Sequence, residues 1–256
     1  METMQKVIET LDANKKISVE VKEEMLSLIG EFYLRFPSVP LETLCDNLRR
    51  LSIEKGSKFV YPSAITYSPV DNKIFINEEM LNKEEIDASH SMMKAIIAMI
   101  TQKGINYGFH NSDLAALNVG FCEIIANNLV GNEGESQFED EQVLVNYIGG
   151  SIGFPVFLKA FVENNPELLM KELLTKCSKP EDLNSLLSQA NNNMYTRRQS
   201  GESRLLYIQA LASLMFEVDT KYLMAALQDV SPTKYVDYEE LDELIHSQSM
   251  EWTRGK

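Results

Sequence analysis

Apolar residues recur at steps of three and four along most of the chain, which predicts a mostly helical protein. The period is clear over residues 17–36, where Pro37 ends it, and it resumes over 41–51. Further helices are predicted over 83–103, 112–131, 139–150, 155–164, 166–177, 180–190, 202–217, 219–228 and 237–248. A polar stretch at 191–201 has the composition of a linker. It divides the chain into a domain of residues 1–195 and a helical C-terminal part of residues 196–256.

Residues 58–77 break the helical pattern. Short runs of aromatic and β-branched residues alternate here with turn-forming residues, above all Pro69 to Asn72. We predict a small antiparallel sheet with a hairpin at 64–77, whose edge strand is formed by Ile74, Phe75, Ile76 and Asn77. The fold class is therefore α+β, mostly α, with this sheet packed on the helices of residues 83–131.

Charge and cysteine content narrow the choice of partner and compartment. The chain carries 24 Lys and Arg against 38 Asp and Glu, a formal charge of −14, which argues against binding nucleic acid or an anionic membrane. No run approaches the roughly 18 apolar residues that a membrane helix needs. Cys45, Cys122 and Cys177 show no disulfide or zinc spacing, and the first residues do not resemble a signal peptide. We expect a cytoplasmic protein, with an acidic rim at 133–141.

Two predicted helices carry the most informative polar residues. The strand segment IFINEEML is followed by a largely apolar helix that carries His90, then by a loop and a helix reading LNVGFCEIIANNLVG. This order resembles the zinc metallopeptidases of the HExxH type, in the gluzincin group, over roughly residues 58–175. The resemblance implies a zincin-like pair of core helices and a cleft that holds a peptide beside an edge strand.

The chemistry of that family depends on residues that this chain replaces. Two histidines at i and i+4 and a later glutamate bind Zn²⁺, and the glutamate after the first histidine is the general base. Here the pentad reads His90-Ser91-Met92-Met93-Lys94. Ser91 therefore stands at the base position, Lys94 at the second ligand and Val119 at the third, with Glu123 one turn further on. One histidine does not hold catalytic zinc, so we predict no catalytic residue, no metal and no cofactor.

The same residues also allow two purely structural interpretations and two functional ones. His90 could be a hydrogen-bonded core histidine, and Lys94 could lie on the wetter face of its helix. Alternatively, the Lys94 ammonium replaces the metal cation by pairing with Glu123. A rebuilt hydrolase would use zinc held by His90, His110 and Glu123.

The sequence therefore favours a pseudoenzyme over an enzyme. Our leading hypothesis is an inactive metallopeptidase-like protein that binds a peptide or protein through the vestigial site and the edge strand. A helical scaffold that makes its contacts through residues 202–248 is the third possibility.

Overall fold

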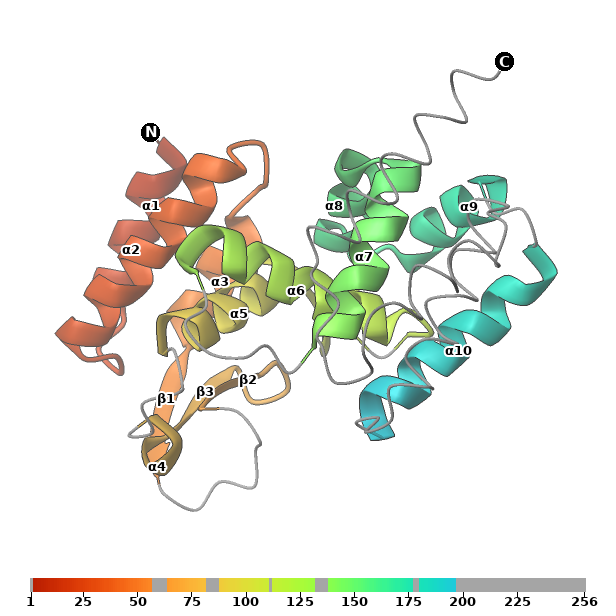
Figure 1. Ribbon diagram of the computed structural model, residues 1–256. Coiled ribbons are helices and arrows are strands. Elements are labelled where there is room, and N and C mark those ends of the chain that lie inside the picture. Colours follow the sequence, from red (N-terminus) through yellow and green to blue (C-terminus); the bar gives the residue numbers. More distant parts are fainter. Residues whose placement is uncertain are drawn as a thin grey trace. The chain divides into compact units, whose positions relative to one another are not determined.

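The computed structural model confirms a mostly helical fold with a small sheet (Figure 1). It describes residues 2–56, 64–81, 88–110, 112–131, 138–176 and 180–196. The chain divides into two compact units, Met1–Thr175 and Lys176–Lys256. In the described ranges, no helix is both long and apolar enough to cross a membrane.

Three helices form the N-terminal part of the first unit. They are α1 (Glu2–Ala13), α2 (Val19–Arg35) and α3 (Glu42–Arg50). The last two were predicted, whereas α1 was not, because its apolar stripe is short: Val7 and Leu11, one turn apart, are fully buried. The Asn14 side chain then joins the end of α1 to α3, since its Nδ2 donates to the carbonyl oxygens of Leu48 at 2.7 Å and Leu51 at 2.9 Å.

The sheet has three strands in the order β1-β3-β2. They are β1 (Ser52–Gly56), β2 (Ile65–Ser68) and β3 (Lys73–Asn77). The predicted hairpin is confirmed, because β2 and β3 pair antiparallel. The prediction of a wholly antiparallel sheet is wrong, since β1 pairs parallel to β3. The segment predicted as a strand at 58–61 lies outside the described residues.

The strand predicted as an edge lies at the centre of the sheet. On one side of β3, the Ser52 N–H donates to the carbonyl oxygen of Asn72 at the head of the strand, at 3.3 Å. On the other side, the Asn77 N–H donates to the carbonyl oxygen of Ala64 at 2.8 Å. Ile74, Phe75, Ile76 and Asn77 are thus flanked by strands on both sides, so the predicted peptide-binding edge strand is wrong. Among the strands that the structure describes, β1 and β2 are the edges.

Two core helices follow the sheet, as predicted. The elements here are α4 (Glu78–Leu81), α5 (Ala88–Ile100), β4 (Gln102–Lys103), β5 (Asn106–Tyr107) and α6 (Ala115–Val130). α6 ends before Gly131 as expected, but its N-cap is Leu114 and not Ser112. The Ser112 hydroxyl instead stabilises the preceding turn, donating to Phe109 O at 2.6 Å and accepting from the Leu114 N–H at 3.1 Å. The start predicted for α5, at 82–87, lies outside the described residues.

The remaining helices are α7 (Glu139–Ile152), α8 (Phe154–Val162) and α9 (Pro166–Lys176) in the first unit, and α10 (Pro180–Thr196) in the second. α6 and α7 approach closely at Gly120, where an added Cβ would lie 2.2 Å from the Glu141 carbonyl oxygen. The predicted linker is wrong up to residue 196, because α10 extends to Thr196. Its last residues and the helices predicted at 202–248 lie outside the described part of the chain.

Candidate functional site

The helices α5 and α6 lie side by side in the first unit (Figure 1). A cluster of polar side chains joins them. His90 and Lys94 lie one helical turn apart on α5, so both side chains leave the helix on the same face. Glu123 faces them from α6, a helix that is apolar at most of its other positions. We call His90, Lys94 and Glu123 the charged trio.

The carboxylate of Glu123 is the centre of the charged trio. Glu123 is only 2% exposed, and each of its oxygens faces one partner. Oε1 accepts a hydrogen bond from Lys94 Nζ, and Oε2 lies 3.3 Å from His90 Nε2. His90 is also buried, whereas the Lys94 side chain is 29% exposed. The trio therefore holds a buried negative charge with one of its two partners at the protein surface.

The trio sets the protonation state of its carboxylate. Burial alone would raise the pKa of Glu123, because the charged form loses its hydration. The hydrogen bond from His90 and the charge and hydrogen bond of Lys94 outweigh that effect, so the pKa of Glu123 lies below its usual value. Glu123 is therefore a carboxylate at neutral pH.

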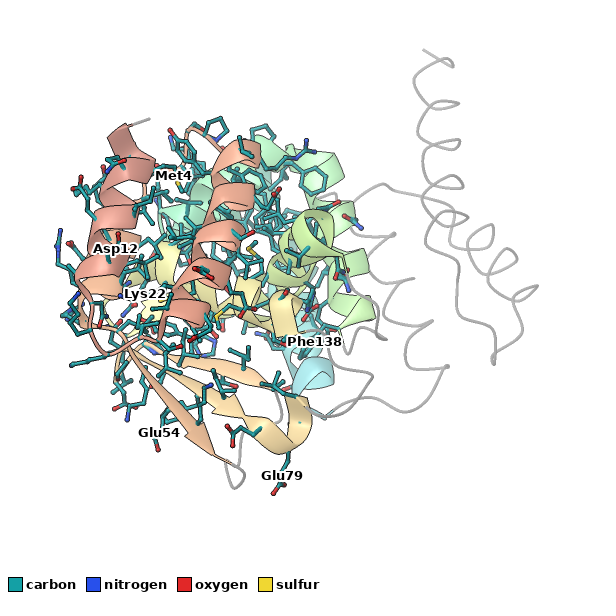
Figure 2. All side chains as sticks on the ribbon, turned by 90° about the vertical axis from the view of Figure 1, so that its left-hand side faces the viewer. Met4, Asp12, Lys22, Glu54, Glu79 and Phe138 are labelled. Carbon is teal, nitrogen blue, oxygen red and sulfur yellow. The ribbon has the colours of Figure 1, made fainter. Side chains whose placement is uncertain are left out.

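The partly exposed Lys94 also contacts an aromatic ring. Its Nζ lies 5.4 Å from the centroid of Phe138, a half-buried residue directly before α7. A cation over a ring at this distance is attracted by the negative face of the π system. Phe138 is labelled in Figure 2, next to the helices of the site. The ammonium thus has a carboxylate on one side and an aromatic ring on another.

Of the predicted site residues, only three form the cluster. Of the two interpretations of Lys94, the structure shows the one in which it pairs with Glu123. Ser91 and Val119 are half-buried and bring no charge to it. Glu123, one turn beyond Val119, is the residue of α6 that reaches His90 and Lys94.

The alternative metal site is not assembled. His110 follows β5, where its ring stacks on Tyr107 with centroids 4.6 Å apart and planes 8° from parallel. Burial lowers the pKa of His110. Across the part of the chain that the structure describes, no group of three or more His, Cys, Asp or Glu is placed to hold a metal. His90, His110 and Glu123 therefore do not form the ligand set that the rebuilt hydrolase requires.

The charged trio is also a poor zinc site in itself. It supplies two donor groups, the His90 imidazole and the Glu123 carboxylate, while catalytic zinc sites use three protein ligands. Lys94 brings a positive charge to the carboxylate that a metal would need. The residues present therefore do not fit the zinc that the family resemblance implies.

The neighbouring thiol does not add a reactive group. The pKa of Cys122 is raised to about 12, and burial is the main cause. The charge of Lys94 lowers this pKa and the charge of Glu123 raises it, both to smaller extents. The thiolate is the nucleophilic and metal-binding form of cysteine. Cys122 therefore stays protonated near neutral pH and acts as a small core residue.

The acidic rim predicted at 133–141 receives little support. Residues 132–137 lie outside the described part of the chain. Glu141, the last residue of the predicted rim, is buried at 7% exposure. It faces the interior because α7 packs against α6 at this point, next to Gly120.

A second polar cluster, which the sequence did not reveal, lies at one end of the sheet. The Tyr67 hydroxyl oxygen is 2.7 Å from Asn72 Oδ1 and 2.5 Å from Gln102 Oε1. Asn72 Nδ2 donates to the Asn47 carbonyl, and Asn47 Nδ2 donates to the carbonyl of Met99 in the last turn of α5, both at 2.9 Å. We call Asn47, Tyr67, Asn72 and Gln102 the neutral network. Its members are far apart in sequence and follow no motif, so only the folded chain identifies it.

Comparison of the chain with known proteins finds no matching family model, no similar curated protein and no similar solved structure. The interpretation of the site therefore depends on the geometry of this chain.

Proposed function

We propose that this protein is a catalytically inactive, metallopeptidase-like protein that acts by binding a peptide or another protein. The observation that carries the proposal is the position of Lys94. It stands where the second histidine of HExxH would be, and its ammonium pairs with the carboxylate opposite His90. A cation of the chain itself thus takes the place that a metal ion would have between the two helices.

Lys94, the partly exposed member of the charged trio, is the residue that we expect a partner to contact. Lys94 is partly exposed beside Phe138, so a partner can contact a cation and an aromatic ring together. Aromatic side chains, phenylalanine among them, are enriched at protein interfaces. The buried carboxylate holds the lysine in place before a partner arrives, which reduces the entropy lost on binding.

The first experiment rebuilds the metal site. The variant Lys94→His restores the histidine pair with His90 and leaves Glu123 opposite as a third ligand. If the helix pair is zincin-like, the variant binds about one zinc per chain, measured by mass spectrometry of metals after dialysis against zinc. Wild-type protein purified without chelator is expected to contain far less. The matched control is Lys103→His, which adds a histidine at an exposed position of β4.

The outcomes separate the parts of the proposal. A folded Lys94→His protein that binds no more zinc than Lys103→His would contradict the metallopeptidase-like arrangement. Stoichiometric zinc in the wild type, or cleavage of a quenched fluorescent peptide library that is lost in His90→Ala, would contradict inactivity. Circular dichroism checks that each variant is folded.

The binding role has its own experiment. Proteins captured from a cell extract by the wild type are compared with those captured by Lys94→Met and by Lys171→Met, which removes an exposed lysine of α9. A partner whose binding depends on the site is retained by the Lys171 variant and lost from the Lys94 variant. Equal retention by both variants would place binding elsewhere on the molecule.

A further inference from the structure

Two tight turns at one end of the sheet each expose an aliphatic side chain. Val70, in the turn between β2 and β3, is 71% exposed, and Ile105, in the turn between β4 and β5, is 60% exposed. Single exposed apolar residues are common on protein surfaces and need no explanation. These two differ because one side chain, that of Gln102, bonds the backbone just before each of them.

Gln102 holds the two turns together. Its Nε2 donates to Pro69 O at 3.3 Å and to Gly104 O at 2.8 Å, and these carbonyls directly precede the two aliphatic residues. Its Oε1 faces Tyr67, so the bridge is anchored in the neutral network. The turns themselves are tight, with a positive φ of 65° at Gly104. Both exposed side chains therefore stand on rigid, mutually fixed backbone.

The charges at this end of the sheet contrast with the acidity of the whole chain. Arg50 and Lys103 are exposed, and within the described residues neither forms an ion pair with a carboxylate. Lys103 directly precedes Gly104, and the charge of Arg50 acts on Tyr67. Asp71, which accepts a hydrogen bond from Ser68 Oγ at 2.9 Å, is the acidic residue of the turn. In a chain with a net charge of −14, this is a locally basic surface.

From this juxtaposition we propose that Val70, Ile105, Arg50 and Lys103, the paired-turn surface, form a docking surface for a protein segment that carries apolar side chains flanked by carboxylates. The aliphatic pair supplies the contact that excludes water, and the cations select and steer the acidic flanks. Because Gln102 already holds the two turns, they lose less conformational entropy on binding than mobile turns would. The surface is separate from the charged trio, so its failure would leave the proposed function unaffected.

A membrane is the less suitable occupant. Two aliphatic side chains bring fewer methylene groups than a single myristoyl chain, which on its own gives only marginal membrane binding. The net charge of −14 also repels an anionic bilayer. A protein segment avoids both problems, because it brings its own apolar groups and a charge opposite to the local one.

The test is a selection from a random peptide library displayed on phage, with the full-length protein as bait. Enriched peptides are synthesised and their affinity is measured for the wild type and for Val70→Ser/Ile105→Ser. We expect peptides that combine apolar residues with Asp or Glu, and affinity at least about tenfold weaker for the double variant. Leu34→Ser, which removes an equally exposed aliphatic residue from α2, is expected to bind like the wild type.

Two further measurements define the role of charge and rigidity. Arg50→Gln/Lys103→Gln should weaken binding, and the difference from the wild type should shrink as salt is added. Gln102→Ala should weaken it as well, although the exposed residues are unchanged. Peptides that bind the double serine variant as well as the wild type, peptides with basic flanks, an absence of enrichment, or binding to phosphatidylserine vesicles that requires Val70 and Ile105 would each overturn the proposal.

Discussion

The charged trio and the neutral network both connect α5 to another part of the fold, but with different chemistry. The neutral network joins the end of α5 to α3 and the sheet through amide, hydroxyl and carbonyl groups. The trio joins the middle of α5 to α6 through a buried carboxylate, a lysine and a histidine. Neutral polar groups lose little free energy on burial when they are hydrogen-bonded. A buried ion pair is favourable only if the attraction between its charges exceeds the free energy of hydration that both charges lose. Burying charge where neutral groups would suffice suggests a constraint other than stability, and this is the reason to look for function at the trio.

The largest expected loss of stability follows from replacing Lys94, and it should exceed the loss from replacing Glu123. Lys94→Met leaves the Glu123 carboxylate buried without its cation, and removing one partner of a buried pair costs at least about 3 kcal/mol of unfolding free energy. Glu123→Gln should cost less, about 1–2 kcal/mol, because the partly exposed Lys94 can turn to solvent. Urea unfolding at about pH 7 measures both.

The matched control for this pair is Lys103→Met, which removes an exposed lysine and should change stability by less than about 0.5 kcal/mol. The double variant Lys94→Met/Glu123→Gln should be more stable than Lys94→Met alone, since it no longer buries an unpaired charge. If Glu123→Gln proved the more damaging single change, the carboxylate would have a structural role that the ion pair does not explain.

The trio also shows what a sequence can and cannot predict about a site. The pairing of Lys94 with Glu123 was predictable, because a partly buried lysine on an apolar helix needs a carboxylate to stay charged. The register of α6 was not, since Val119 and Glu123 are one turn apart and either satisfies the helical period. Only the packing of α6 on α5 selects between them.

In the sheet, too, one part could be predicted from the sequence and another could not. The β2–β3 hairpin follows from local alternation and turn residues, so it was predicted correctly. β1 is short and contains Glu54, Lys55 and Gly56, and its parallel pairing with β3 is non-local. Missing β1 made β3 an edge strand in the prediction, although its Ile74 and Ile76 are buried at the centre of the sheet.

An intermediate effect is expected in the neutral network. Tyr67→Phe removes the hydroxyl that lies between Asn72 Oδ1 and Gln102 Oε1, so whichever of these oxygens accepts its single hydrogen loses a partner, at a cost of about 1–2 kcal/mol. Because Gln102 also bridges the two turns, the variant should weaken peptide binding to the paired-turn surface. Unfolding by urea and peptide titration test the two effects separately. The control is Tyr33→Phe, a tyrosine of α2 outside the network. Equal losses in the two variants would show that the network contributes nothing specific.

The smallest effect is a difference in pH dependence between the two regions. The folded pKa of Glu123 lies below its unfolded value of about 4.5, so its contribution is present above pH 4.5 and is lost as the pH falls through the folded pKa. The stability gap between the wild type and Glu123→Gln should therefore narrow as the pH falls below about 4.5. Burial raises the pKa of Tyr67, whose contribution is lost only as the pH rises above its unfolded value of about 10. The gap between the wild type and Tyr67→Phe should accordingly stay constant over the acidic range. Urea unfolding at several pH values compares the two variants directly, and a Glu123→Gln gap that did not shrink relative to the Tyr67→Phe gap as the pH falls below about 4.5 would contradict the charged character of the trio.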